Sequence, residues 1–231
     1  MPAKNRTKEY VADSYYHIYN RGVEKRIIFT DMQDYNVFLS YLSTYLLPKD
    51  EIGLMSIIES ESATQQEKDA ARKLLRMNNF YGKLTLHAYC LMPNHFHLFV
   101  YQTEETIIDQ FMNSLFTRYS MYFNKRHKRV GPLFQSLYKA VRIVTDEQLQ
   151  HITRYIHRNP MDLAVQGPAL QDYAYSSFGN YLGLRRSEWV NVEKILALFS
   201  NSKKKYEEFV EQRDDVAMIE CVGSLLFNER D

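Results

Sequence analysis

The chain has 231 residues with 45% apolar and 25% charged side chains, which favours one soluble globular domain with extensions and excludes a disordered or coiled-coil chain. The formal net charge is only +1, and no apolar run approaches the ~20 residues of a membrane helix or forms a signal peptide, so we predict a cytoplasmic protein without a membrane partner. Cys90 and Cys221 lack CxxC spacing, which excludes a zinc ribbon and a disulfide framework and predicts two reduced thiols.

The first predicted elements are a strand and a helix. Residues 14–20 are rich in aromatic and β-branched types and stop at Arg21-Gly22, as a strand does before a turn. Residues 31–47 carry apolar side chains at helical spacing and end before Pro48. Residues 50–79 are polar and predict an inserted charged segment, helical near 68–77, to which we assign no chemistry.

A hairpin and two further helices follow. Residues 83–90 alternate strictly between apolar and polar types, which predicts a strand with Leu84, Leu86, Ala88 and Cys90 on one face. The remaining predicted elements are a turn at 92–94, a return strand at 96–101, an amphipathic helix at 106–124, a strand at 136–144, and a helix that begins with a capping box at Thr145 and ends near Pro160.

This order of elements predicts an α+β fold: a ferredoxin-like antiparallel sheet with helices on one face. The other face of such a sheet stays available for a ligand. We expect a main domain over residues 1–182, which contains the insert at about 50–79, and a helical C-terminal extension over residues 183–231.

Two histidines mark the candidate site. On the predicted return strand, Phe96, Leu98 and Val100 face the helices, whereas His95 and His97 share the opposite face with Cα atoms about 6.6 Å apart. Imidazoles at that spacing can converge on one metal ion. An ordinary pair of exposed histidines is the alternative, because this spacing alone is common.

The helix before Pro160 supplies possible partners for the histidines. His151, Tyr155 and Asn159 follow at four-residue steps on a face beside the apolar stripe. If this face lies over the histidines, Asn159 can offer an amide oxygen to a metal, and Tyr155 can aim its hydroxyl at what the metal holds. His151 is a candidate proton acceptor, although a surface histidine is the simpler interpretation. Packing and helix termination are the ordinary roles for Tyr155 and Asn159.

Basic residues gather in the second half of the chain. From Gln110 to Thr145 there are seven Lys or Arg residues and no Asp or Glu, with tyrosines and phenylalanines among them. Such a mixture suits phosphate contacts beside base stacking, although a charged stretch is often only a solvated face. The candidate DNA contacts are Arg118, Lys125, Arg126, Lys139 and Arg142, together with Arg21 in the first turn.

Two segments resemble the signatures of a known family. The chain is similar to the single-tyrosine HUH transposases of the IS200-like type, and within them to the REP-associated tyrosine transposases, in Leu91-Met92-Pro93-Asn94-His95-Phe96-His97-Leu98 and Arg154-Tyr155-Ile156-His157-Arg158-Asn159-Pro160. Shorter matching stretches extend the resemblance over roughly residues 14–182. The insert at 50–79 and the tail lie outside the pattern.

The resemblance implies a role for each site residue. His95 and His97 would be the metal ligands, Asn159 would take the third ligand position, where related transposases more often have Gln, and Tyr155 would be the nucleophile. The cofactor would be Mg²⁺ or Mn²⁺. The implied partner is single-stranded DNA, with hairpin-forming repeats (REP elements) beside the cut. Family members differ in oligomeric state, so a homodimer stays open.

The implied reaction is metal-dependent DNA transposition. Attack by Tyr155 would leave a 5′-phosphotyrosine link and a free 3′-hydroxyl, from which strands can be rejoined without ATP. Two other classes stay open: a non-catalytic single-stranded nucleic-acid-binding protein, and a His-based metallohydrolase that uses water. The second usually brings a third His or a carboxylate, and the sequence contains no HExxH motif.

Overall fold

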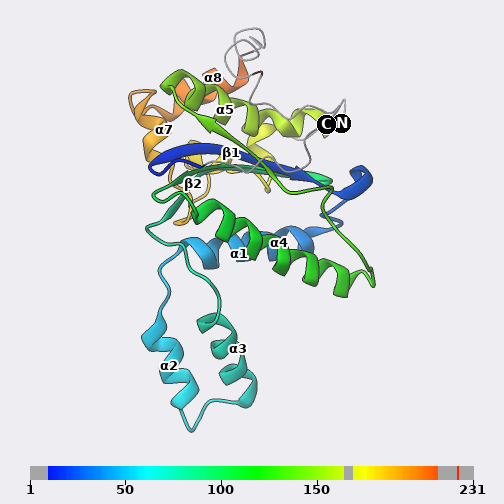
Figure 1. Cartoon of the computed structure of the whole chain (residues 1–231). Coiled ribbons are helices and arrows are strands. Elements are labelled where there is room, and N and C mark those ends of the chain that lie inside the picture. Colours follow the sequence, from blue (N-terminus) through cyan, green and yellow to red (C-terminus); the bar gives the residue numbers. More distant parts are fainter. Residues whose placement is uncertain (1–9, 164–168, 213–222, 224–231) are drawn as a thin grey trace.

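The computed structural model describes residues 10–163, 169–212 and 223 (Figure 1). Its centre is a four-stranded antiparallel sheet in the order β2-β3-β1-β4. These strands are β1 (Ser14–Arg21), β2 (Leu84–Met92), β3 (His95–Gln102) and β4 (Lys139–Ile143). The predicted α+β class with an antiparallel sheet is therefore confirmed.

β3 lies inside the sheet, between its hairpin partner β2 and the first strand. The hairpin turn leaves Met92 opposite His95, and on the other side Arg21 of β1 is opposite His95. Because side chains alternate along a strand, Phe96 and Leu98 enter one core cluster, while the odd-numbered residues of β3 face the other side. The predicted faces of β3 are confirmed.

The predicted strict alternation of β2 is wrong at His87. Leu86 pairs with Val100 and Ala88 pairs with Phe99, so His87 is an extra residue that forms a β-bulge. Beyond the bulge the faces exchange: Leu86 and Tyr89 lie in one cluster, whereas Ala88 lies in the other with Cys90 and Met92. The bulge thus preserves apolar packing on both faces of the strand.

Two long helices cover the first face of the sheet: α1 (Met32–Leu46) and α4 (Ile107–Arg126). α1 begins at Asp31, whose carboxylate accepts hydrogen bonds from the backbone of Gln33 and Asp34. Phe38, Leu42, Phe111 and Leu115 are fully buried between these helices and the sheet. A short 3-10 turn, η1 (Val23–Lys25), lies between β1 and α1.

Helices also cover the second face, so the prediction of helices on one face was incomplete. α5 (Asp146–Arg158) lies across this face (Figure 1), followed by the 3-10 turns η2 (Asn159–Leu163) and η3 (Leu170–Asp172). α6 (Phe178–Leu182), α7 (Glu193–Ala197) and α8 (Lys203–Glu211) come next. Ile152 and Ile156 of α5 pack with Tyr206 and Val210 of α8 in the second core cluster. The described part of the predicted extension therefore packs onto the sheet domain.

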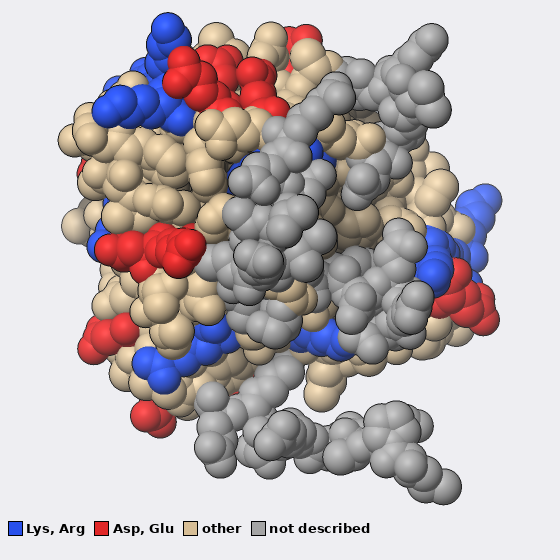
Figure 2. Space-filling view, turned by 90° about the horizontal axis from the view of Figure 1, so that it is seen from above, with Lys and Arg blue, Asp and Glu red and all other residues tan. Residues whose placement is uncertain are grey.

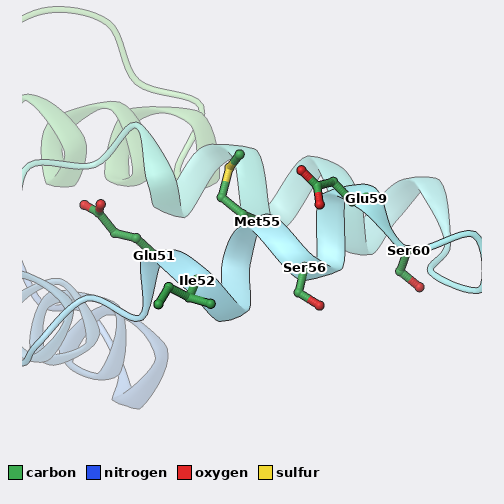
Figure 3. A pocket seen from close by; sticks show the side chains of 6 residues that line it. All are labelled: Glu51, Ile52, Met55, Ser56, Glu59 and Ser60. Atoms are coloured by element: carbon green, nitrogen blue, oxygen red, sulfur yellow. The ribbon is translucent and has the colours of Figure 1, made fainter.

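The insert forms a helical hairpin that projects away from the sheet (Figure 1). It consists of α2 (Glu51–Glu59) and α3 (Gln65–Leu75), and Thr64 and Glu67 form a capping box at the start of α3. A surface hollow runs along α2, where Ile52 and Met55 lie among polar side chains (Figure 3). Ile52 is 87% exposed, so the insert carries apolar surface that its polar composition did not predict.

Two expectations from composition concern membranes and cysteines. Among the described residues, no helix is long and apolar enough to cross a membrane. Cys90 is a free, buried thiol, and burial raises its pKa above the usual value. Cys221 lies outside the described residues.

The buried His87 should make stability depend on pH. Burial lowers the pKa of His87 from 6.5 to about 4. The hydrogen bond between His87 and the carbonyl of Asn191 acts in the opposite direction and raises this pKa, but by less than burial lowers it. Between these values the unfolded chain binds a proton that the folded chain does not, so stability falls as the pH falls from 6.5 towards 4, by about 3 kcal/mol in all. In urea unfolding across this interval, His87→Gln should show a shallower loss than the native chain. If the free energy of unfolding falls equally steeply with pH in both proteins, His87 is not the source of the pH dependence.

Candidate active site

The two histidines of β3 present their rings to the second face of the sheet, below α5. His97 is fully buried and His95 is partly exposed. Their ring centroids lie 5.1 Å apart and the ring planes are nearly perpendicular, at 87°. One histidine therefore belongs to the core, whereas the other opens towards solvent.

α5 brings the other two predicted residues to the same place. Its start is fixed by Thr145, whose hydroxyl accepts the backbone N–H of Gln148. The Tyr155 ring lies 5.3 Å from the His97 ring at 83°, and Asn159 Oδ1 lies 3.3 Å from His95 Nε2. The four residues predicted as metal ligands and nucleophile thus meet between β3 and the C-terminal end of α5.

The structure adds a fifth residue, His17 of β1, to this group. Its Nε2 lies 2.9 Å from His97 Nδ1, both rings are fully buried, and the Tyr155 ring is 6.0 Å away. A histidine that is bound at Nδ1 keeps its ring orientation and presents Nε2 to a ligand. The sequence carried a signal for His17, because alternation in residues 14–20 places it on one face of its strand. Only the pairing of β1 with β3 shows that this face is the His97 face.

Hydrogen bonds fix which atoms His95 and Asn159 present to each other. Asn94 donates its amide to the carbonyl of Lys25 at 3.4 Å, so its Oδ1 accepts from His95 Nδ1 at 2.7 Å. Asn159 donates its Nδ2 to the carbonyl of Tyr155 at 2.9 Å. His95 Nε2 and Asn159 Oδ1 then face each other as two acceptors, an arrangement that a cation between them stabilises.

The electrostatic environment keeps His97 neutral. Burial, followed by the neighbouring His95 and His17, lowers the pKa of His97 well below its usual range, and the hydrogen bond with Asn159 opposes this shift. A neutral imidazole is the form that binds metal ions. In the described part of the chain, no three His, Cys, Asp or Glu side chains are grouped to hold a metal. The candidate donor set is therefore two imidazoles and one amide oxygen.

The idea that His151 faces the site is wrong, and so is the alternative of a surface histidine. His151 is buried, and its ring lies 5.3 Å from the Phe209 ring of α8. Four-residue steps drift around a helix, because one turn is 3.6 residues, so His151 lies on the α8 side while Tyr155 faces His97. His151 is not a candidate proton acceptor.

Three of the six predicted DNA contacts lie on β1 and β4. Arg21 is opposite His95 in the sheet and donates from Nε to Gln135. Lys139 is paired with Tyr19, and its ammonium lies 6.0 Å from the Tyr19 ring centroid. Both therefore belong to the histidine face of the sheet. Arg142 is exposed but is paired with Tyr16, whose side chain packs in the cluster of the opposite face.

The other three lie on α4, on the far side of the sheet from the histidines. Arg126 binds the carboxylates of Asp31, at 2.6 and 2.8 Å, and Asp34, at 2.5 Å, which gives it a structural role. Its hydrogen bond lowers the pKa of Asp31 to about 2. Arg118 and Lys125 line a surface groove and make no such ion pair among the described residues. Figure 2 shows that basic side chains on the α5 side are also dispersed, several beside acidic ones.

The sheet, the paired histidines and the tyrosine-bearing helix together define the candidate active site. A family model described as "Transposase IS200 like" matches residues 55–159, which include His95, His97, Tyr155 and Asn159. This match spans less than half of the chain, and over this segment the chain is similar to the IS200-like transposase family.

Two solved structures are similar to the chain. One is described as a REP-associated tyrosine transposase bound to a REP hairpin: 13% identity over 81% of this chain and 92% of that chain, with a TM-score of 0.43. The other is assigned as a transposase of Deinococcus radiodurans R1: 18% identity over 67% and 96%, with a TM-score of 0.27. At these TM-scores neither structure carries an argument about this chain. No curated protein matches the chain.

Proposed function

We propose that this chain is a metal-dependent single-stranded DNA endonuclease and strand transferase that acts through a 5′-phosphotyrosine intermediate. The observation that carries the proposal is the meeting of Tyr155 and Asn159 with His95 and His97 at one point between α5 and β3. The domain boundaries at residues 182 and 183 stay a prediction.

The residues fit a divalent cation, for which we propose Mg²⁺ or Mn²⁺. His95 Nε2 and Asn159 Oδ1 face each other as acceptors, and His97 is neutral and held by His17 from behind. Two imidazoles and a neutral amide leave the double positive charge of such an ion uncompensated. When bound there, it supplies orientation of the scissile phosphate and neutralises charge in the transition state.

Tyr155 is the proposed nucleophile. Its hydroxyl gives up a proton and its oxygen forms a bond to phosphorus. The bond from phosphorus to the 3′ oxygen of the preceding nucleotide breaks, and that oxygen takes up one proton and leaves as a hydroxyl, so no proton is gained or lost overall. The phosphate then joins the tyrosine to the 5′ end of the downstream strand. Because one phosphoester replaces another, a second strand's 3′-hydroxyl can reverse the step without ATP.

The proposed substrate is single-stranded DNA with a hairpin beside the cut, as in REP-type repeats. Arg21 and Lys139 lie on the face where the strand would be cut. The groove on α4, with a volume of about 890 Å³, is a second candidate surface for DNA binding. None of the described residues that line it is Asp or Glu, and they include Lys73, Arg118, Lys125, Tyr41 and Tyr122. Cations beside tyrosines suit phosphate contacts with stacking.

Replacement of the basic residues of α4 should distinguish those that contact DNA, Arg118 and Lys125, from Arg126, which stabilises the fold. For the double variant Arg118→Gln with Lys125→Gln we expect weaker binding of single-stranded DNA. The slope of log affinity against log salt concentration should become shallower by about 1.4, because each of two phosphates that are no longer neutralised contributes ~0.7. For Arg126→Gln we expect a lower unfolding temperature and unchanged salt dependence, because Asp31 and buried Asp34 lose their partner. Fluorescence anisotropy at several salt concentrations and thermal unfolding measure both. If the salt dependence changes only in Arg126→Gln and not in the double variant, the groove is not the DNA-binding surface.

The direct test of the function uses end-labelled single strands with and without a hairpin, incubated with Mg²⁺, Mn²⁺ or EDTA. We expect a protein–DNA adduct that survives a denaturing gel, forms only with the metal, and needs the hairpin. Cleavage without an adduct would indicate a metallohydrolase. Tight binding without any cleavage would indicate a nucleic-acid-binding protein. Either outcome would overturn the proposal.

A further inference from the structure

The side of α5 that faces away from His97 is bound by the tail helix α8. His157 is fully buried and lies 2.7 Å from the hydroxyl of Tyr206 through Nδ1, and 2.8 Å from Ser177 Oγ through Nε2. Ser177 Oγ in turn accepts the backbone N–H of Tyr89 in β2 at 2.9 Å. His157 therefore connects α5 both to α8 and to the sheet.

Two arginines of α5 bind one atom at the end of α8. Arg154 and Arg158 both donate to the carbonyl oxygen of Gln212, Arg158 at 2.6 Å. Arg154 is 1% exposed, and its guanidinium lies 5.3 Å from the Phe209 ring centroid. Carbonyls at a helix C-terminus carry partial negative charge and lack partners within the helix, so two cations there hold the helix end firmly.

These contacts alternate along α5 with the residues of the candidate site. Tyr155 and Asn159 face the histidines, whereas Arg154, His157 and Arg158 face α8 and β2. One turn of a helix is 3.6 residues, so any rotation or slide of α5 that moves one group moves the other. Misplacement of a reacting group by about 1 Å can cost about a hundredfold in rate.

We propose that α8 is a positioning element for the nucleophile helix: through Tyr206 and the Gln212 carbonyl it holds α5 so that Tyr155 and Asn159 meet His95 and His97. This rests on the proposed function, in which Tyr155 attacks the DNA. Arg154, His157 and Arg158 are positioning residues that act through the placement of α5. The tail is in this way part of the cutting apparatus.

The test compares Arg154→Met with Arg154→Lys in the full chain, with Lys204→Ala on the exposed side of α8 as the control. Three quantities are measured: the unfolding temperature, the affinity for labelled hairpin DNA in a Tyr155→Phe background, and the single-turnover rate of adduct formation. For Arg154→Met we expect a rate at least about tenfold lower with affinity unchanged within about twofold. Arg154→Lys should recover part of the rate, because a cation still reaches the Gln212 carbonyl. Lys204→Ala should behave as the native chain.

Three results would overturn the positioning role. They are an unchanged rate in Arg154→Met, a rate that falls only as far as the fraction of folded protein, and a loss of affinity equal to the loss of rate. If Arg154→Met is unfolded at the assay temperature, Arg158→Gln is measured in its place, since it removes the partly exposed donor to the same carbonyl. Failure of the proposed function is distinct, because the native chain would then form no adduct for either variant to slow.

Discussion

Tyr155→Phe is expected to abolish the covalent protein–DNA adduct while the fold and the affinity for DNA persist. The ring packs against His97 and His17, and phenylalanine keeps these ring contacts while it removes the oxygen of the proposed nucleophile. Loss of a nucleophile typically costs roughly 10⁴-fold or more in rate. Denaturing gels with labelled hairpin strands measure the adduct, and anisotropy measures binding.

A matched control is available on the same face of the sheet. The Tyr19 ring lies 6.0 Å from the His97 ring, so its hydroxyl is an alternative nucleophile to test. We expect Tyr19→Phe to form the adduct at close to the native rate. An adduct that survives Tyr155→Phe and disappears in Tyr19→Phe would transfer the nucleophile role to β1.

His97→Ala should remove metal-dependent cleavage at every metal concentration tested. His97 Nδ1 is bound to His17, which leaves Nε2 as the proposed metal ligand, so His97→Ala would delete a proposed ligand. His17→Gln should be milder, because loss of a residue that orients a ligand typically costs about 10-fold to 100-fold in metal affinity. Titration of Mn²⁺ in the cleavage assay separates the two variants.

The titration has a clear expected pattern. Added Mn²⁺ should restore cleavage by His17→Gln and should not restore cleavage by His97→Ala, with DNA binding retained in both. If His97→Ala cleaves at the native rate, the candidate metal site is wrong. If excess Mn²⁺ leaves His17→Gln inactive, His17 does more than orient its neighbour.

Much of the candidate site was predictable because strand and helix periods are local properties. Alternation along β3 placed His95 and His97 on one face, and the capping residue Thr145 placed the start of the helix that carries Tyr155. What joined them was the resemblance of two short segments to a family, since neither spacing is specific alone. The roles of these residues stay predictions until the variants are measured.

The features that sequence did not predict depend on contacts between distant segments. His17 joins the site only because β1 pairs with β3, and the bulge at His87 follows from packing on both faces of β2. His151 faces α8 because the tail returns over α5, which no local pattern in residues 146–158 encodes. The ion pairs of Arg126 could not be predicted from local sequence, because its carboxylate partners lie over 90 residues away.

The most direct test of the proposed function is to digest the purified adduct and identify by mass spectrometry the residue that carries the nucleotide. We expect a single phosphotyrosine at Tyr155, joined to the 5′ end of the cut strand, formed only with Mg²⁺ or Mn²⁺. A nucleotide on another residue, a link to the 3′ end, or cut strands with no attached peptide would contradict the proposed function.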